Sequence, residues 1–389
     1  MTPTALNGVA SAMDYRKEFA EFDDVIYLDT ATQGPMPLAA ANAAKQALEW
    51  KKLPYRLTEE IYFELPDRVR SSIAKLIGAA ADDIAITTGA SAGFAAVAAG
   101  IEWKPGDEVI VGKGEFPAHF ATWLPYERSG KLKVRIIEPA GRFITADDYI
   151  ANLTPRTRLV SASLVRFDNG ARLDAARVAA ACRASGALFL LDASQCAGAI
   201  PMKVAALGCD FLVSSGYKWM LGSYGTGFFW AKREWSDRLP LGPVYWMALE
   251  GAHKFHGLPL NALRVRAGAR RWDTAETANF TNLAAWDAAL QILVGIGTEK
   301  LYAHNLELIR MLVDRLPHDR CVLASPVEEE RCGQFVCVAS RDSAKTAGLY
   351  EKLKAEKIYV GLREGALRVS PYIYNTERDM ARLIAVLSV

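Results

Sequence analysis

The sequence predicts an α/β fold in which a mostly parallel central sheet is covered by helices. In the segment 134–213, short apolar runs alternate with helical segments, an order typical of parallel strands joined by helical crossovers. Continuous apolar runs at 187–191, 210–213 and 227–230 favour strands that are buried on both faces. In such a sheet the active site is expected beyond the carboxyl ends of the strands.

The composition is that of an ordinary globular chain. Its 389 residues, 51% hydrophobic and 23% charged, suffice for one large core and a second, smaller domain. The net charge of +2 comes from interspersed signs, and the basic cluster at 131–135 fits a solvated strand edge, so we expect no nucleic-acid partner. Residues 1–19 lack a signal-peptide pattern and no apolar run reaches membrane-span length, so we expect no membrane partner.

The cysteine pattern predicts a reduced, cytoplasmic protein without a metal site. The six cysteines form no CxxC pair and have no histidine at metal-ligand spacing; they lie at positions 182, 196, 209, 321, 332 and 337. Cys196 lies close in sequence to Asp192, but a small buried thiol on a packed helix is the simpler interpretation.

The N-terminal part predicts a strand, a turn and two helices. Residues 24–37 form a short strand that runs into a polar turn closed by two prolines. Helices are predicted over roughly 38–52 and 57–77, and the second has apolar residues near helical spacing at Ile61, Leu65, Val69, Ile73 and Leu76.

An anion site is predicted after the next strand. The run 84–88 reads as a strand, Gly89-Ala90-Ser91 as a turn, and the small residues that follow as a helix. Free backbone N–H groups and the positive end of that helix would then face an anion such as a phosphate. The following strand, 108–111, leads to a loop that contains Phe116 and His119.

The most informative residues end the buried strands. Asp192 follows the run 187–191 and Lys218 follows the run 210–213, so an acid and an amine leave neighbouring strand ends. Pyridoxal phosphate needs such a pair, because a lysine holds its aldehyde as a Schiff base and an acid keeps its ring nitrogen protonated. The residues around Lys218 are large and mostly apolar, and desolvation there would favour the neutral, nucleophilic amine.

The segments DASQ at 192–195, SSGYK at 214–218 and YGTG at 224–227 resemble the class V aminotransferase family, which includes cysteine desulfurases and isopenicillin N epimerase-like proteins. The resemblance covers nearly the whole chain. It implies the type I fold of pyridoxal-phosphate enzymes and a homodimer with shared active sites. It also implies a large cofactor-binding domain over 38–280, and a smaller α+β domain formed by 1–37 and 281–389.

The resemblance also implies roles for individual residues. Lys218 corresponds to the Schiff-base lysine, Asp192 to the acid at the pyridine nitrogen and Gln195 to a residue near the phenolic oxygen. The other implied cofactor contacts are Ala90, Ser91, Ser215, Tyr217 and Thr277. Phe116 occupies the position of a stacking ring that is usually histidine in desulfurases; burial in the core is its alternative. His119 would supply a polar contact or be structural.

Two positions depart from the family pattern. Arg166 stands where asparagine is frequent, and would either stabilise the phenolic oxygen or form a surface ion pair. Glu276 falls near a threonine that contacts the phosphate from the partner subunit, and its charge would repel the phosphate. Thr274 or Thr277 must then make that contact, or the contact is absent.

Substrate contacts are implied at both ends of the chain. Ala31 and Thr32 occupy a turn that lies near the substrate in the family, although a turn fixed by Gly34 and Pro35 explains the segment equally well. A long helix over roughly 281–316 precedes a smaller α+β region. There Arg368, in the predicted strand 366–369, corresponds to the arginine that binds the substrate carboxylate.

Two alternatives remain for this assignment. Arg363 could bind the carboxylate in place of Arg368, or Arg368 could form an ion pair with a glutamate on the face of the strand. The segment 361–368 contains no cysteine that could attack a substrate sulfur, and the nearest upstream cysteine, Cys337, lies in an apparent strand. Persulfide chemistry is therefore disfavoured.

The predicted activity is that of a pyridoxal-phosphate enzyme acting on an α-amino acid through an external aldimine. Aminotransferase is predicted on family frequency alone, because fold and cofactor constrain the reaction weakly. A C–S β-elimination lyase or an amino-acid epimerase is the alternative, and a non-catalytic pyridoxal-phosphate-binding protein is a more distant one.

Overall fold

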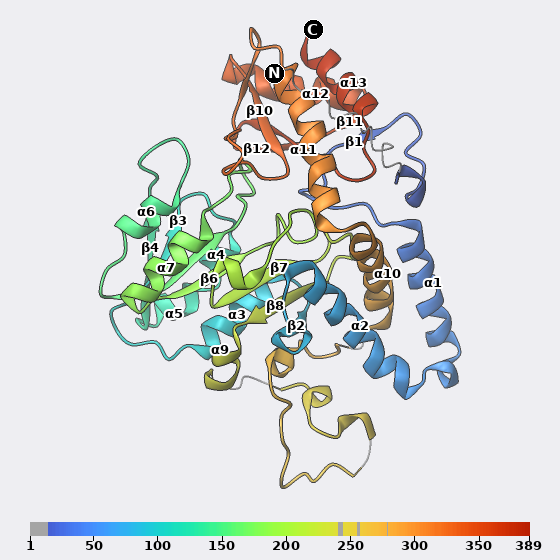
Figure 1. The fold of residues 1–389 in the computed structure, drawn as a ribbon, viewed down its shortest axis with the longest axis vertical. Helices are drawn as coiled ribbons and strands as arrows, with labels where there is room; N and C mark the ends of the chain where they lie inside the picture. The colour runs from blue at the N-terminus through green and yellow to red at the C-terminus, as the bar shows by residue number, and fades with distance from the viewer. Residues whose placement is uncertain (1–14, 240–243, 255–256, 278) are drawn as a thin grey trace, which may run out of the picture.

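A seven-stranded sheet forms the centre of the protein (Figure 1). The computed structural model describes residues 15–239, 244–254, 257–277 and 279–389. The strand order is β2-β8-β7-β6-β5-β3-β4, and only β8 runs against its neighbours, so the predicted mostly parallel sheet is confirmed. The strands are β2 (Ile84–Thr87), β3 (Asp107–Gly112), β4 (Leu132–Ile137), β5 (Thr157–Ser163), β6 (Leu188–Asp192), β7 (Phe211–Ser215) and β8 (Gly227–Ala231).

Helices cover both faces of this sheet, which explains why its strands are apolar throughout. Leu188 and Leu190 of β6 pack in one core with helix α3 (Ala90–Gly100). Phe189 and Leu191 of the same strand pack in a second core, with α7 (Ala175–Ser185). Successive side chains of a strand point to opposite faces, so a strand between two helical layers needs an apolar residue at each position.

The two helices predicted over 38–52 and 57–77 are confirmed. Helix α1 spans Leu38–Lys52, and α2 spans Glu59–Ile77, beginning at a Thr58 cap and ending at Gly78 in the left-handed conformation. The shorter helices are α4 (Ala118–Ala121), α5 (Leu124–Arg128), α6 (Ala146–Ala151), α8 (Val204–Leu207) and α9 (Arg233–Arg238).

The single long helix predicted over 281–316 is wrong. Two helices occupy the segment, α10 (Phe280–Ile296) and α11 (Thr298–Asp314), and they are bent by 81° at Gly297. Gly297 has a φ of 88°, which lies outside the helical region and favours glycine. Helix α10 packs against α1 and α2, whereas α11 leads towards the C-terminal part.

A second, smaller body lies at the top of Figure 1. Its antiparallel sheet has the order β12-β13-β10-β9, with β9 (Cys321–Leu323), β10 (Val336–Ser340), β12 (Gly361–Arg363) and β13 (Ala366–Val369). Helices α12 (Thr346–Ala355) and α13 (Glu377–Leu387) pack with it around a separate core. The strand predicted over 366–369 is confirmed as β13.

The two ends of the chain meet in this smaller body. Strand β1 (Ile26–Tyr27) pairs in parallel with β11 (Ile358–Tyr359), and Asp29 forms a bridge with Ser370. The N-terminal segment therefore lies beside β13. The division into 1–37 and 281–389 on one side and 38–280 on the other stays a prediction.

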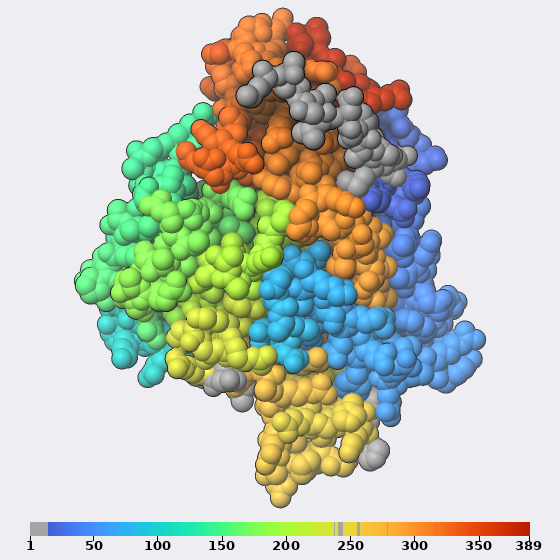
Figure 2. All heavy atoms as spheres, in the orientation of Figure 1, coloured from blue at the N-terminus to red at the C-terminus, as the bar shows by residue number. Residues whose placement is uncertain are grey.

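The segment between α9 and α10 projects from the bottom of the molecule (Figure 2). Its described residues contain only short 3-10 turns, in agreement with the predicted loop. No single described helix is long and apolar enough to span a membrane. Helices α10 and α11 meet that criterion only as a bent pair, and the apolar residues of α10 lie in the core.

Replacement of Gly34 by alanine should distort the segment that holds Lys218. A Cβ atom at position 34 would overlap the carbonyl oxygen of Lys218 and lie 2.7 Å from Leu221 Cδ2. We expect a loss of about 2–3 kcal/mol in the free energy of unfolding, measured by urea denaturation. Gly295→Ala is the matched control, since its Cβ meets nothing within 4 Å and the helix should gain up to about 1 kcal/mol. Equal effects of both changes would contradict this.

Candidate active site

One cavity joins the two residues on which the cofactor prediction depends. Lys218 and Asp192 both line a cavity of about 190 Å³ at the carboxyl ends of β6 and β7. The full lining is Thr88, Gly89, Ala90, Ser91, Ala92, Phe116, Ala118, Ser163, Val165, Phe167, Asp192, Ser194, Gln195, Ser215, Tyr217, Lys218 and Tyr224. Its position beyond the strand ends is the one predicted for an α/β sheet.

Lys218 is a buried amine. Its side chain is 8% exposed, and its Nζ lies 5.5 Å from the ring centroid of Phe116 and 5.8 Å from that of Tyr217. Burial, together with the charges of Arg368 and Arg363, lowers the pKa of Lys218 from 10.5 to about 8, against the opposing charge of Asp192. The neutral, nucleophilic form is therefore accessible near neutral pH.

Asp192 is held as a carboxylate. Its Oδ1 accepts a hydrogen bond of 2.7 Å from the N–H of Ser194, and its Oδ2 lies 3.6 Å from His119 Nε2. Burial alone would raise the pKa of Asp192, but the contacts with His119 and Ser194 outweigh it, so the pKa is lowered. An ionised acid here can pair with a protonated ring nitrogen.

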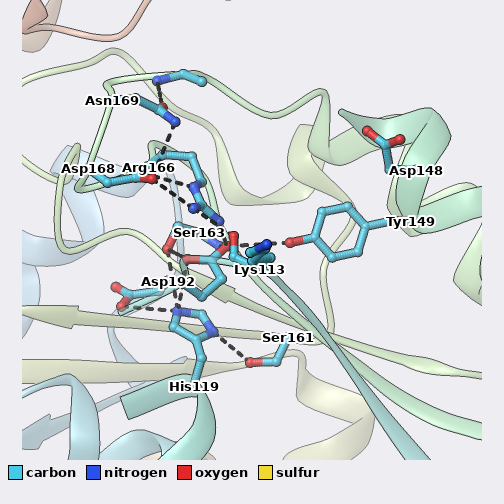
Figure 3. Close-up of polar contacts among 12 residues, drawn as sticks. Lys113, His119, Asp148, Tyr149, Ser161, Ser163, Arg166, Asp168, Asn169 and Asp192 are labelled. Atoms are coloured by element: carbon cyan, nitrogen blue, oxygen red, sulfur yellow. Dashed lines mark hydrogen bonds and ion pairs between the residues drawn. The ribbon is translucent and has the colours of Figure 1, made fainter. Parts of the chain in front are cut away.

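His119 connects Asp192 to a second buried carboxylate (Figure 3). Its Nδ1 lies 2.8 Å from Ser161 Oγ, and its Nε2 lies 3.8 Å from a carboxylate oxygen of Glu115. Glu115 accepts hydrogen bonds from Ser163, from the N–H at 2.9 Å and from the hydroxyl at 2.6 Å. His119 thus makes polar contacts with Asp192, which lines the cavity, in agreement with the first of its two predicted alternatives.

Arg166 belongs to this buried network. It is 4% exposed, lies 3.4 Å from Glu115, and forms a two-pronged pair with Asp168 at 3.1 and 3.0 Å (Figure 3). The alternative of a surface ion pair is wrong. The cavity lining includes Val165 and Phe167 but not Arg166, so a contact with the phenolic oxygen is not supported either.

The first turn of α3 forms one end of the cavity. Gly89 precedes the helix with φ 152° and ψ 174°, a conformation restricted to glycine, and it has no side chain that could cap the helix. The N–H of Ala90 points to Ser215 Oγ at 3.5 Å. Ala90 and Ser91, expected in the turn, are the first helical residues. This end can hold an anion through backbone N–H groups and the helix dipole.

The segment around Thr277 does not line this cavity. Thr277 is buried, and its hydroxyl donates to the carbonyl of Thr274 at 2.6 Å. Glu276 adopts φ 59°, and its carboxylate accepts a hydrogen bond from the Tyr245 hydroxyl at 3.4 Å. A contact of Thr277 with phosphate could therefore be made only in a neighbouring subunit, and it stays a prediction.

Phe116 presents its ring to the cavity. It is 42% exposed, so the alternative that it is a core residue is wrong. It packs edge-on against Phe167, with ring centroids 5.4 Å apart. A flat ligand can therefore lie against one aromatic ring here.

Gln195 ties the N-terminal turn to the lysine segment. Its Nε2 donates to the carbonyl of Ala31 at 2.9 Å, and its Oε1 accepts from Trp219 Nε1 at 3.0 Å. Ala31, predicted near the substrate, and Gln195, predicted near the phenolic oxygen, are thus in contact.

Arg368 contacts both the N-terminal turn and the cavity lining. Its guanidinium is 2% exposed and donates to the carbonyl of Phe167 at 2.9 Å, to Thr32 Oγ1 at 2.5 Å and to Asp29 Oδ1 at 3.2 Å. The ion-pair partner is thus an aspartate of the N-terminal segment, not the glutamate that was considered. Burial lowers the pKa of Arg368, whereas Asp29 opposes the shift.

The cysteines lie outside this chemistry. All six are free and buried, and Cys196 lies in a turn rather than on the expected helix. Burial and the charge of Asp192 raise the pKa of the Cys196 thiol well above its usual range. Among the described residues, no group of three or more metal-ligating side chains could hold an ion.

The sequence reading missed several contributors to the site. Ser163, Val165 and Phe167 line the cavity from alternate positions at and after the end of β5. This period-two pattern could have identified them and shown that Arg166 points away. Glu115 precedes His119 by four residues, but its other partners come from distant segments. No residue near Asp29 in the sequence indicated that it pairs with Arg368.

Comparison with known proteins decides the family. The model of the family described as "Aminotransferase class-V" matches residues 26–383. The chain belongs to this family. An uncharacterized aminotransferase of Bacillus subtilis is 27% identical over 321 residues, covering 82% of each chain. Isopenicillin N epimerase of Streptomyces clavuligerus is 26% identical over 93% of this chain and 94% of the epimerase. The predicted family is confirmed.

A solved structure confirms the fold. A lysine-to-alanine mutant of C-DES, with glycine covalently linked to its pyridoxal-phosphate cofactor, superposes with a TM-score of 0.84 over 96% of this chain and 98% of C-DES, at 22% identity. C-DES is named a cystine C–S lyase. This class-V protein therefore has the type I fold of pyridoxal-phosphate enzymes, as predicted.

The cofactor-free protein should be destabilised by Lys218 in a pH-dependent way. Below pH 8 the folded state must bury a charged amine; between pH 8 and 10.5 only the unfolded state holds the proton, so stability rises with pH. Lys218→Met should therefore stabilise the protein by up to about 3 kcal/mol at pH 7, and the gain should vanish near pH 10.5.

Urea unfolding at a series of pH values measures this difference. Lys45→Met, at an exposed position of α1, is the control and should show no such dependence. A difference between Lys218→Met and the parent protein that does not change with pH would refute the buried charged amine.

Proposed function

We propose that this class-V protein is a pyridoxal-phosphate-dependent aminotransferase of α-amino acids. One observation carries the proposal: a buried amine with a lowered pKa and a buried carboxylate line the same cavity, and a helix N-terminus forms its other end. No metal group competes for this role among the residues that the structure describes.

The residues present fit pyridoxal phosphate. Gly89, Ala90, Ser91 and Ser215 would hold the phosphate, and Phe116 would pack on the ring. Asp192 would face the ring nitrogen, and Lys218 would hold the aldehyde carbon. When bound, this cofactor withdraws electrons from the α-carbon of an amino acid and so makes its proton removable.

The chain's own residues then bind the substrate and move one proton. Arg368 would bind the α-carboxylate, since a guanidinium matches a carboxylate with two parallel hydrogen bonds. Lys218 Nζ, whose pKa is lowered to about 8, would in its neutral form take the proton from Cα and return it at a second position. Phe116 and Tyr217 border the amine and would exclude water from it.

A C–S lyase or an amino-acid epimerase would use the same groups and differ in where the proton returns or which bond breaks. The similarity to isopenicillin N epimerase supports keeping the epimerase. Desulfurase chemistry is disfavoured: Cys337 lies in β10 opposite Arg368, and burial raises the pKa of its thiol to about 12.

Incubation with a panel of L-amino acids tests the reaction. An aminotransferase should accumulate pyridoxamine phosphate in a single half-turnover and release a keto acid without ammonia. Pyruvate and ammonia from amino acids with a leaving group at the β-carbon would show a lyase, and loss of optical rotation without a keto acid would show an epimerase. Either result would replace the aminotransferase.

Lys218→Ala tests the lysine itself. The purified protein reconstituted with pyridoxal phosphate should show a long-wavelength absorbance band that this change abolishes. Lys45→Ala, at an exposed site, should keep the band. A band that persists in Lys218→Ala would show that another lysine holds the cofactor.

We also propose that the active form is a homodimer in which the segment around Thr277 completes the partner's site. The position of Thr277 outside the cavity of its own chain supports this, because a contact with a phosphate could then be made only across a subunit interface. Light scattering at micromolar concentration should give twice the mass of one chain, and a fully active monomer would refute the shared site.

A further inference from the structure

A second arginine lies on the same face of the hairpin as Arg368. Strands β12 and β13 pair so that Gly361 lies opposite Arg368 and Arg363 lies opposite Ala366. Arg363 and Arg368 are therefore diagonal neighbours on one face, with backbones roughly 7–8 Å apart. A one-residue change in this register would turn one of them to the other face.

The two guanidinium groups converge on one hydroxyl oxygen. Thr32 Oγ1 accepts a hydrogen bond of 3.0 Å from Arg363 Nη2 and one of 2.5 Å from Arg368 Nη2. Arg368 also donates to the carbonyl of Phe167, a residue of the cavity lining. The pair of cations therefore stands at the edge of the cavity that holds Lys218.

The charges at this edge do not balance. Asp29 pairs with Arg368 at 3.2 Å, and the glycine at position 361 leaves room for this pair, because a Cβ there would lie 2.9 Å from Asp29 Oδ1. No carboxylate in the described parts of the chain lies within 4 Å of Arg363, whose other hydrogen bond goes to the carbonyl of Leu362. Both arginines lower the pKa of Lys218, so their positive charge reaches the cavity.

We propose that the site selects α-amino acids with an acidic side chain, with Arg368 holding the α-carboxylate and Arg363 holding the anion at the end of the side chain. This substrate class rests on the proposed function, since the amino group must reach Lys218. Two neighbouring cations repel each other, and a substrate with two anionic groups removes that repulsion while it satisfies both guanidinium groups.

Binding of simple acids tests the proposal without turnover. Succinate and glutarate carry two carboxylates, whereas butyrate and valerate are their single-carboxylate counterparts; none has an amine, so none can react. Calorimetric titration of the protein loaded with pyridoxal phosphate should show the diacids binding roughly tenfold or more tightly. Arg363→Gln should remove most of this advantage, and Arg363→Lys should keep part of it, because charge remains without the planar fork.

Arg378→Gln is the matched control. Arg378 is exposed on α13 and its loss changes the net charge equally, so the preference for diacids should persist. Arg368→Gln should weaken the binding of monoacids and diacids alike.

Kinetics supply the second readout. The ratio of kcat/KM for L-glutamate over L-glutamine should exceed one in the parent protein and fall roughly tenfold or more in Arg363→Gln, mainly through KM. A sulfinate or phosphate side chain in place of the carboxylate should behave as glutamate does.

Three results would overturn the proposal: equal binding of monoacids and diacids by the parent protein, equal kinetics with the acid and its amide, or an equal loss of butyrate and succinate binding in Arg363→Gln. The last would make Arg363 the α-carboxylate site. If pyridoxal phosphate fails to bind, the proposed function fails instead, and the same titration of the cofactor-free protein still decides whether one or two carboxylates are held.

Discussion

The site depends on the burial of one amine. Lys218 follows β7 in a segment whose neighbours, Trp219, Met220 and Leu221, are fully buried, so its charged form is held out of water. The N-terminal turn closes on this segment: Gly34 donates its N–H to the carbonyl of Tyr217 and packs against the carbonyl of Lys218. The smaller body is therefore connected to the cavity through the same backbone that carries the lysine.

The other buried charges around the cavity are paired. Asp192 faces His119, Glu115 faces Arg166, and Arg368 faces Asp29. Breaking a buried pair leaves an uncompensated charge, so these contacts fix the positions of the groups more than they add stability. Two cationic side chains near the cavity have no such close partner among the described residues. Burial lowers the pKa of Lys218, and no carboxylate in the described chain lies within 4 Å of Arg363.

The sequence predicted the features that depend on local patterns of residues, namely the buried strands and the motifs at their ends. The ends of β6 and β7 follow from continuous apolar runs, and β13 from the motif around Arg368. The bend at Gly297 was missed because a helix can tolerate glycine, and the sequence alone does not show that α10 and α11 pack in different directions. Asp29 and Glu115 were missed because the arginines with which they pair, Arg368 and Arg166, lie far away in the sequence.

The ends of β6 and β7 determine where the cofactor chemistry takes place, whereas the hairpin β12–β13 determines which substrate side chain the cavity accepts. Glu364 and Gly365 both have positive φ values, 47° and 76°, the conformation of a tight two-residue turn that matches the twist of its strands. This turn fixes the register and so places Arg363 beside Arg368 instead of on the opposite face. Because the turn belongs to the small body and not to the central sheet, its length and residues can vary without disturbing Lys218 or Asp192. The chemistry common to the family and the selectivity of this member are thus carried by separate parts of the fold.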